Sequence, residues 1–279
     1  MNTDNILAVL VLYKCKLEES DTFLSLSKAL KYSNLKIDLY VYDNSPESDF
    51  NKLDYSDFNV ELIYIHNSNN PGVSKAYNEG GAFATNVKKK WLLLLDQDTF
   101  FNNNYFDVLF ESITINDNSM LFVPTLKANN IIISPCNYYF RKGLTSDIIH
   151  KGKVSCNNKS VLNSGVFIKL SEFNRIGGYN NNVTLYFSDF VFFNRYKKDN
   201  KNFVVLNTVS EHGLSDVTDQ TIENLTRTYK LFCNGAKQAS FSFLDYMQYF
   251  FLTIARGLIL TIRLKTFIFI KLFYKEFIK

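Results

Sequence analysis

The sequence predicts an α/β protein with a mixed, mostly parallel sheet flanked by helices and a helical C-terminal extension. Short apolar runs without polar alternation recur in the first 100 residues, as in strands buried on both faces of a sheet. Segments of helical length separate these runs, which gives the βαβ rhythm of a parallel sheet. From Thr221 onward the pattern is helical. We therefore expect an α/β domain over residues 1–220 and a helical segment over residues 221–279.

The first part of the chain supplies the parallel strands. Apolar runs place strands at 6–13, 37–42, 60–65 and 91–95. Asp21 is a candidate cap for a helix that reaches Tyr32. The inner side of that helix is expected to carry four apolar residues, Phe23, Leu24, Leu26 and Leu30. Pro71-Gly72 opens a second helix that runs through Val87, and its alanines suit close packing on a sheet.

The middle of the chain is less regular. Strands are expected at 121–124, 131–135, 161–170 and 203–206, and the strand over 161–170 contains Asn163-Ser164-Gly165. Helices are expected at 101–115, after a cap at Ser171, and at 188–199. Residues 150–160 are polar and predict a loop.

Composition and charge exclude several classes of protein. The chain is 46% hydrophobic and 21% charged, as in a globular protein with a core, and its net charge of +4 does not indicate a nucleic-acid partner. The four cysteines form no CxxC pair, which argues against zinc and favours a reducing compartment. The N-terminal apolar run lacks a basic flank, so we expect a strand rather than a signal peptide and a cytoplasmic location.

The stretch WLLLLDQDTF, residues 91–100, places Asp96 and Asp98 where a buried strand ends, at the edge of a parallel sheet that binds ligands. A dinucleotide-binding domain would need a glycine-rich turn after the first strand, and KCKLEES follows Tyr13 instead. The two acids also fit the motif of a haloacid-dehalogenase-type phosphatase. That motif has its threonine four residues after the first Asp, a position that Phe100 occupies here, and Thr99 lies one residue too early.

Five segments in order resemble family 2 glycosyltransferases of the GT-A fold, particularly rhamnosyltransferase-like bacterial enzymes. They are LAVLVLYK, VYDNSPE, NNPGVSKAYNEGGAFA, LLLLDQDT and LNSGVFIKLSEFNRIGGYNNNVTLYFSDFVFFNRYKK, within residues 5–215. The resemblance implies a nucleotide-sugar donor, a saccharide acceptor and inversion at the anomeric carbon. It also suggests a role in a bacterial surface polysaccharide such as O-antigen or capsule.

A sugar nucleotide brings a negatively charged diphosphate, which two carboxylates would repel unless a divalent cation lay between them. Strand alternation sends Asp96 and Asp98 to the same side, and their hard oxygens suit Mn²⁺ or Mg²⁺. In similar enzymes the second acid is the metal ligand, the first contacts ribose or bound water, and a histidine at the position of His212 approaches the metal or diphosphate. The alternatives are an acid that caps the next helix and a surface histidine.

The resemblance assigns the donor nucleotide to residues at the ends of these strands. The expected set is Tyr13, Asp43, Asn44, Asn70, Gly72, Asn78 and Asp96. Asp43 can also form an Asx-turn before Pro46. The Asn70, Gly72 and Asn78 pattern would point a helix N-terminus at the diphosphate, with Lys75 either adding charge or lying on the surface.

Asp189, in YFSDFVFFNR, is the candidate general base. An apolar setting raises the proton affinity of a carboxylate, which would take the proton of the acceptor hydroxyl. The alternative is a helix cap, which Ser188 could also provide. The sugar-side residues implied by the resemblance are Ser164, Gly165 and Arg195, although the first two also fit a plain bend and Arg195 could pair with Asp189 or be exposed. A basic–aromatic patch at Arg227 and Tyr229 would lie near the acceptor.

Residues 241–279 are dense in Phe, Leu and Ile, and basic residues outnumber the two acids, Asp245 and Glu276. Charges interrupt the run of about 18 apolar residues that a spanning helix requires. The pattern predicts helices that lie in an anionic membrane interface, on the inner face of the plasma membrane, beside a lipid-linked acceptor. The alternatives are packing on the α/β domain and a homodimer interface.

Two other classes of function stay open on the sequence alone. One is a phosphatase of the DxD type. The other is a membrane-bound saccharide-binding protein of the same fold without turnover, against which the presence of Asp43, Asp96, Asp98 and Asp189 argues.

Overall fold

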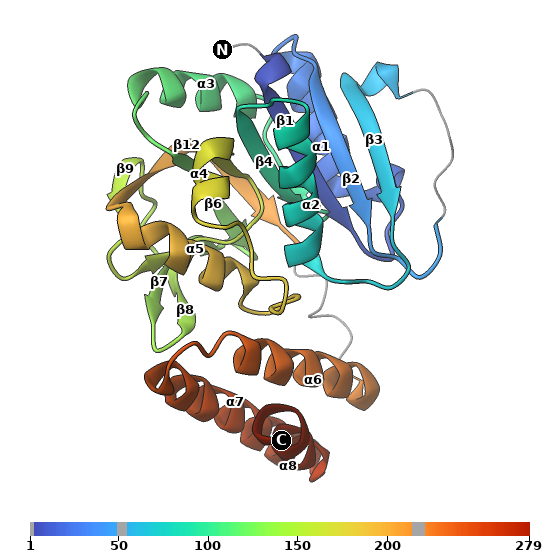
Figure 1. Ribbon diagram of the computed structural model, residues 1–279, viewed down its shortest axis with the longest axis vertical. Helices are drawn as coiled ribbons and strands as arrows, with labels where there is room; N and C mark the ends of the chain where they lie inside the picture. The colour runs from blue at the N-terminus through green and yellow to red at the C-terminus, as the bar shows by residue number, and fades with distance from the viewer. Residues whose placement is uncertain (1–2, 49–54, 214–220) are drawn as a thin grey trace.

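The computed structural model describes residues 3–48, 55–213 and 221–279. A central sheet carries helices on both faces, and the C-terminal helices form a separate layer beneath it (Figure 1). The strand order is β10-β7-β6-β11-β4-β1-β2-β3, with β12 pairing with β5, β6 and β9 and β8 with β7. The predicted α/β fold with a C-terminal helical extension is confirmed.

The N-terminal half forms the parallel part of the sheet. Its strands are β1 (Ile6–Leu12), β2 (Ile37–Asp43), β3 (Val60–His66) and β4 (Trp91–Asp96), and its helices are α1 (Asp21–Tyr32) and α2 (Val73–Asn86). β1 pairs in parallel with both β2 and β4, and β2 pairs in parallel with β3. The cap of α1 is Ser20 and not Asp21, because the Ser20 hydroxyl accepts the Phe23 N–H at 3.2 Å.

The second half mixes strand directions. Its elements are β5 (Thr99–Phe100), α3 (Tyr105–Ile115), β6 (Leu121–Ala128), β7 (Ile131–Tyr139), β8 (Lys142–Ser146), β9 (Gly152–Ser155), β10 (Lys159–Ser160), β11 (Val166–Lys169), α4 (Leu170–Arg175), α5 (Ser188–Asp199) and β12 (Asn202–His212). β11 runs antiparallel to β4 and β6. β12 runs parallel to β6 and then antiparallel to β5, which places His212 opposite Thr99.

Several expectations for this half were wrong. The polar segment 150–160 contains β9 and β10, because a strand edge can be polar when it faces water. Residues 161–165 lie outside β11, Ser171 lies inside α4, and no side chain caps that helix. β12 extends beyond the apolar run 203–206. A bulge between Val205 and Val209 interrupts the pattern of burial there, so the apolar run alone did not show the full length of the strand.

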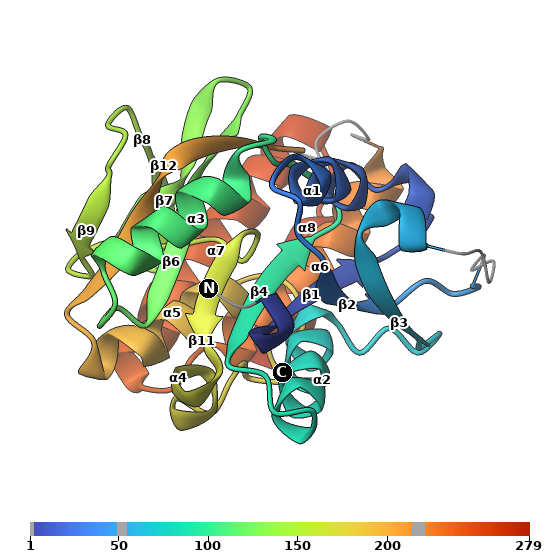
Figure 2. The ribbon, with the colours of Figure 1, turned by 90° about the horizontal axis from the view of Figure 1, so that it is seen from above.

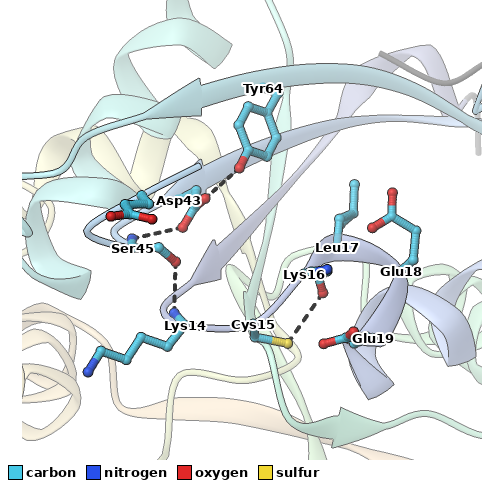
Figure 3. Close-up of a pocket in the computed structure, with 10 residues that line it drawn as sticks. Lys14, Cys15, Lys16, Leu17, Glu18, Glu19, Asp43, Ser45 and Tyr64 are labelled. Atoms are coloured by element: carbon cyan, nitrogen blue, oxygen red, sulfur yellow. Dashed lines mark hydrogen bonds between the residues drawn. The ribbon is translucent and has the colours of Figure 1, made fainter. Parts of the chain in front are cut away.

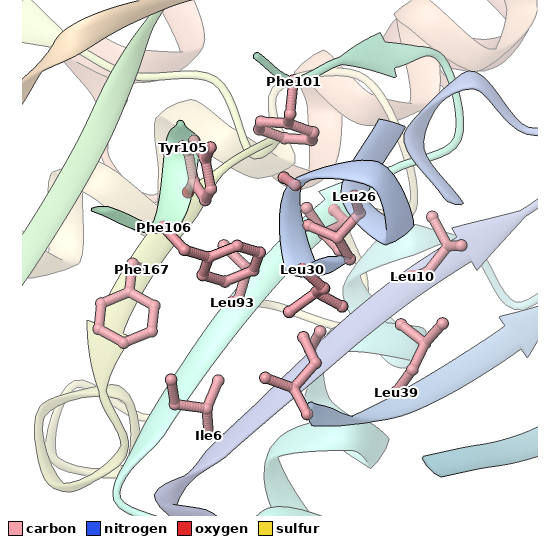
Figure 4. Packing of buried hydrophobic residues seen from close by; sticks show 14 of the residues in the cluster. Ile6, Leu10, Leu26, Leu30, Leu39, Leu93, Phe101, Tyr105, Phe106 and Phe167 are labelled. Atoms are coloured by element: carbon pink, nitrogen blue, oxygen red, sulfur yellow. The ribbon is translucent and has the colours of Figure 1, made fainter. Parts of the chain in front are cut away.

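Two apolar layers fix the sheet. α1 and α3 cover one face, and α2, α4 and α5 cover the other (Figure 2). Figure 4 shows Leu26 and Leu30 of α1 packed over Leu10 and Leu93 of the strands. Leu24, expected on the inner side, is only partly buried. Each fully buried leucine stabilises the fold by about 1.5–3 kcal/mol, so the edge of the sheet is a rigid base for polar side chains.

The C-terminal layer comprises α6 (Ile222–Gln238), α7 (Phe243–Leu264), α8 (Ile268–Leu272) and a short π-helical segment, Phe273–Ile278. These helices share an apolar core with Val183, Phe187 and Val191 of the α/β part. Their inner side therefore packs on that part. Within the described residues, α7 alone is long and apolar enough to cross a membrane, with a mean hydropathy of 1.2.

Candidate active site

The site lies where β1, β2 and β4 end. In the parallel register Asp43 stands beside Leu12 and Asp96 stands beside Val11, so the two acids flank the end of the same strand. The carboxyl ends of these strands face the layer of C-terminal helices (Figure 1). This edge is the position at which open α/β sheets bind ligands.

Asp43 lies in a cavity of about 190 Å³ that is lined by Asp43 of β2, Tyr64 of β3 and residues of the segments that follow β1 and β2 (Figure 3). Its Oδ1 accepts the Ser45 N–H at 2.8 Å, and its Oδ2 accepts the hydroxyl of Tyr64. The bond to Ser45 is the Asx-turn that the sequence allowed. The carboxylate is 3% exposed and held in place, so it can present its remaining lone pairs to a ligand N–H or hydroxyl.

Asn44 follows on the same strand end and is 2% exposed. Its N–H donates to Leu12 O at 2.8 Å, whereas its side-chain Oδ1 has no hydrogen-bond partner among the residues that the structure describes. A buried amide oxygen without a partner costs about 1–3 kcal/mol. Asn44 is not among the residues that line the Asp43 cavity.

The acids after β4 lie in a turn and not on an extended strand. β4 ends at Asp96, and Gln97 and Asp98 form the turn to β5, so strand alternation does not explain why the two acids are close. Asp98 does not cap the next helix, which begins after Asn104. Gly213 at the end of β12 donates its N–H to Asp98 O at 2.6 Å, which brings β12 against this turn.

Asp96 and Asp98 have different partners in this turn. Asp96 Oδ1 accepts the Tyr77 hydroxyl at 2.7 Å. Burial raises the pKa of Asp96, His212 opposes that shift, and the charge of Asp98 adds to it. Asp98 Oδ1 lies 3.6 Å from His212 Nδ1, and both side chains are partly exposed. His212 Nδ1 also lies 2.7 Å from Thr99 Oγ1, which leaves Nε2 for another partner.

Several residues that sequence reasoning missed hold the acidic turn in place. Gln97 Oε1 accepts the Tyr13 N–H at 2.7 Å, and Gln97 Nε2 donates to Tyr13 O at 3.3 Å. Thr99 N–H donates to Thr22 Oγ1 at 2.8 Å. The position of Gln97 between two acids was visible in the sequence, but its partner Tyr13, which follows β1, was not. Nothing in the sequence predicted the contact of Tyr77 with Asp96, apart from the position of Tyr77 in an expected helix.

Ser164 lies beneath the same turn. Its hydroxyl accepts the Asp96 N–H at 3.3 Å and the Thr99 hydroxyl at 2.7 Å. Gly165 has a φ of +79°, and a Cβ there would lie 2.6 Å from Pro124 Cγ. Ser164 is buried, so this pair supports the site from below, and a contact with the donor sugar remains a prediction.

Asp189 is the second residue of α5. Burial raises its pKa to about 7, the Phe190 N–H bonded at 2.7 Å opposes this shift, and the charge of Asp96 adds to it. It does not cap the helix, which starts at Ser188 after Phe187 without a side-chain cap. A carboxyl group with a pKa near neutrality is suited to exchange protons at physiological pH.

Electrostatic coupling places these acids in one region. The pKa of the Cys15 thiol, which lines the Asp43 cavity, is raised by burial and then by Glu19, Asp21, Asp98 and Asp43. Asp96 in turn raises the pKa of Asp189. Charges separated by protein and salt solution interact appreciably only over about 10 Å, so Asp43 and Asp98 lie within reach of Cys15, and Asp96 within reach of Asp189, while the Asp43 cavity itself is lined by none of Asp96, Asp98 and Asp189.

Three residues of the expected donor set lie elsewhere or have other partners. Asn78 donates to Tyr179 O at 2.9 Å and accepts the Tyr179 N–H at 2.8 Å, so it anchors a loop. Asn70 is an exposed turn residue. Gly72 precedes α2, whose first N–H, from Val73, donates to Thr184 O at 2.8 Å. The start of α2 is thus covered by protein and does not face an open anion site.

The basic residues that the sequence singled out also lie outside the cleft. Lys75 pairs with Glu79 at 3.2 Å on the surface of α2. Arg195 donates to Gly177 O and Gly178 O at 3.2 and 3.0 Å and does not pair with Asp189. Tyr229 is fully buried and donates to Thr253 O at 2.9 Å, so the expected acceptor patch with Arg227 is wrong.

Asp98 and His212 have the types of donor atom that a divalent cation can use, but a cation here would need further ligands. Among the described residues, no group of three or more His, Cys, Asp and Glu side chains could bind a metal alone. Asp98 supplies carboxylate oxygens and His212 supplies Nε2. Mg²⁺ and Mn²⁺ commonly take one or two carboxylates from the protein and complete their shell with phosphate oxygens and water.

Comparisons with known proteins bear on the fold and on part of the sequence. Residues 18–132 match the family model described as "Glycosyl transferase family 2". A search of curated protein sequences finds no match. Crystal structures of S. aureus TarS are similar in fold, and the first has a TM-score of 0.54 at 12% identity over 92% of this chain and 43% of that chain.

Two further TarS structures, of residues 1–349, carry ligands. The UDP complex has a TM-score of 0.51 at 15% identity and covers 89% of this chain and 70% of that chain. The UDP-GlcNAc complex has a TM-score of 0.53 at 11% identity and covers 94% of this chain and 81% of that chain. The chain therefore has the GT-A fold of these structures, and its residues 18–132 carry the sequence pattern of glycosyltransferase family 2.

Proposed function

We propose that the protein transfers a sugar from a nucleoside diphosphate donor to a saccharide acceptor, with inversion at the anomeric carbon. The observation that carries this proposal is the placement of Asp43 and Asp96 at the ends of the strands on either side of β1 in a GT-A sheet, with Asp98 in the turn after Asp96. TarS structures of the same fold bind UDP and UDP-GlcNAc, which supports a nucleotide-sugar donor. The rhamnosyltransferase-like enzymes that the sequence resembles suggest a hexose or deoxyhexose as the sugar.

The donor would lie along the strand ends. The nucleoside would occupy the Asp43 cavity, where the Asp43 carboxylate accepts its N–H or hydroxyl groups. The diphosphate lies toward Asp98 and His212, which would hold Mn²⁺ or Mg²⁺. The cation, when bound, neutralises the charge that develops on the leaving nucleoside diphosphate. Tyr77 and Gln97 keep the acidic turn in position while this charge changes.

The chemistry is a single displacement. Asp189 accepts the proton of the acceptor hydroxyl as that oxygen bonds to the anomeric carbon. The bond from this carbon to the diphosphate oxygen breaks, and the nucleoside diphosphate leaves with the electron pair. One displacement inverts the anomeric configuration. A base with a pKa of about 7 is ionised in a useful fraction at neutral pH and still binds the proton it removes.

A donor screen tests the proposal. A panel of nucleotide sugars is added to the purified protein with Mn²⁺, and the melting temperature is measured, since a ligand that binds the folded state stabilises it. Donors that raise the melting temperature are then incubated with saccharide acceptors, and the anomeric configuration of the product is determined by NMR. The absence of any stabilising nucleotide sugar contradicts the proposal. Hydrolysis of a generic aryl phosphate would support the phosphatase instead.

We also propose that the acceptor is a lipid-linked saccharide of a bacterial surface polysaccharide, such as O-antigen or capsule. The protein would then lie on the inner face of the plasma membrane, held by its C-terminal helices. The outer side of α7 supports this placement because it exposes a row of large apolar side chains, namely Leu244, Phe251, Leu258, Ile259 and Ile262.

In the C-terminal helical layer, the acidic side chains are largely covered and the exposed charged side chains are basic. Asp245 is bonded by Arg141 of the β7–β8 hairpin, and Glu276 is bonded by Asn234 and lies 3.7 Å from Lys230. Both acids are thereby largely covered. The exposed charges of residues 241–279 are all cations, namely Arg263, Lys265, Lys271, Lys275 and Lys279. An apolar face bordered by cations complements an anionic bilayer better than it complements a second, equally basic copy.

A matched pair of substitutions tests the membrane face. Ile262 on α7 and Ile115 on α3 are 76% and 72% exposed, so a glutamate at either position costs the fold little. We expect Ile262→Glu to abolish cosedimentation with phosphatidylglycerol vesicles and Ile115→Glu to leave it unchanged. Equal loss in both variants, or equal retention, contradicts the membrane face. Dimers of the wild type that Ile262→Glu dissociates would assign this face to a second copy.

A further inference from the structure

The turn that leads to Asp189 lies between the sheet and the C-terminal helices. On the sheet side it is held by polar bonds, since Asn78 binds Tyr179 and the Ser74 hydroxyl donates to Val183 O at 2.5 Å. On the side of the C-terminal helices, the turn is held by contacts between aromatic side chains. The ring centroid of Phe187 lies 4.8 Å from that of Phe232 on α6 and 5.0 Å from that of Tyr249 on α7.

Phe187 has an uncommon backbone conformation. Its φ is 71° and its ψ is 0°, in the left-handed region, which costs a residue with a side chain roughly 1–2 kcal/mol. It is 8% exposed, and α5 has no side-chain cap that would fix its start. Contacts of the ring must therefore offset the cost. An off-centre aromatic pair contributes about 0.5–1.5 kcal/mol beyond its buried area, so two such pairs are enough.

The backbone before Phe187 also touches α6 directly. A Cβ on Gly235 would lie 2.7 Å from Tyr186 O, so the helix can approach the turn this closely only with glycine at that position. The Arg256 guanidinium of α7 lies 4.3 Å from the Phe232 ring centroid and 5.7 Å from that of Tyr186. Both long C-terminal helices thus contribute to the surface on which the turn rests.

We propose that α6 and α7 are a positioning element for the general base, through Phe232, Tyr249 and Gly235 acting on Tyr186 and Phe187. This inference rests on the proposed function in that it takes Asp189 as the base. It assigns the C-terminal layer a role in the rate of transfer that does not depend on a membrane. A displacement of about 1 Å in a catalytic group can cost on the order of 100-fold in rate, so a small shift of this turn is sufficient.

Two glycine substitutions in the same layer test the inference. Gly235→Ala places a methyl group against Tyr186 O, whereas in Gly257→Ala the methyl group meets Tyr229 Oη, 2.3 Å away and inside the helical layer. Both replace a helical glycine by alanine, so the gain in helix propensity is the same. The measurements are kcat with a soluble acceptor, donor affinity by calorimetry, and hydrogen exchange of the amides of residues 183–191.

We expect Gly235→Ala to lower kcat about tenfold or more, to leave donor affinity within about twofold of the wild-type value, and to speed exchange in residues 183–191. Gly257→Ala should change none of these while it remains folded. Unchanged exchange in Gly235→Ala overturns the inference even if no donor is ever found. Equal loss of kcat in both variants also overturns it, because the effect would then belong to the layer as a whole. Failure of the proposed function is seen separately, as a wild type that binds no nucleotide sugar.

Discussion

The two ends of the cleft are held by different kinds of interaction. At the donor end, hydrogen bonds fix each acid: Ser45 and Tyr64 bind Asp43, and Tyr77 binds Asp96. At the acceptor end, Asp189 accepts one bond from its neighbour and is otherwise held through aromatic packing on a separate layer of helices. Hydrogen bonds orient the donor-end carboxylates, whereas Asp189 has a single such bond, and burial raises the pKa of both Asp96 and Asp189. Under the proposed function, one end binds the donor and the other accepts a proton.

The largest expected effect comes from removing the proton acceptor. Asp189→Asn keeps the shape of the side chain but cannot accept the proton, so we expect kcat to fall by about 10²–10⁴-fold. Donor affinity should stay within about twofold of that of the wild type, because the change lies at the other end of the cleft. Steady-state kinetics and calorimetry measure both quantities. A variant that turns over at the wild-type rate would remove Asp189 from the mechanism.

Asp98, the proposed metal ligand, should show the opposite pattern. Asp98→Ala removes the carboxylate beside His212, so we expect the affinity for the nucleoside diphosphate with Mn²⁺ to fall by about 10- to 100-fold. Without Mn²⁺ the two proteins should bind the nucleotide with similar affinity. Calorimetry with and without the metal checks this. An equal loss of affinity in both conditions would mean that Asp98 contacts the donor directly.

The wild-type pH profile sharpens the contrast between the ends. Asp189 must be ionised to accept a proton, and burial raises its pKa to about 7. Below that pH, kcat should fall about tenfold per pH unit, and above it kcat should level off. Donor affinity should not follow this curve. A kcat that is flat from pH 5.5 to 8 would indicate that Asp189 is either ionised throughout or not the base.

The same contrast explains what the sequence could and could not predict. The donor-end strands were predictable because continuous apolar runs mark buried parallel strands, and Asp43 and Asp96 stand where those runs end. His212 was predicted through the family resemblance and not from a local sequence pattern. It lies at the site because β12 continues past a polar bulge and pairs with β5. That pairing depends on residues more than 100 positions apart.

The acceptor end was less accessible to sequence reasoning. Asp189 was recognisable by its aromatic neighbours, and the helix over 188–199 was predicted to the residue. The left-handed backbone of Phe187 and its two ring partners could not be predicted. A glycine or asparagine would have indicated a positive φ in the sequence, whereas here tertiary packing sets φ at a phenylalanine. Tyr229 was wrongly assigned to the acceptor because a short motif does not show whether a residue is buried inside a layer of helices.

The smallest expected effect concerns the Tyr64 hydroxyl, which holds the Asp43 carboxylate in place. Tyr64→Phe removes the hydroxyl that donates to Asp43 and keeps the ring, and a hydrogen bond to a charged group contributes about 1.5–3 kcal/mol. Asp43 keeps its bond to the Ser45 N–H, so only part of this energy should be lost, and we expect KM for the donor to rise several-fold with kcat unchanged. Tyr32→Phe is the control, because that tyrosine is exposed on α1. A fall in kcat with unchanged KM in Tyr64→Phe would show that the two ends of the cleft are coupled, and the division between binding and proton transfer would have to be abandoned.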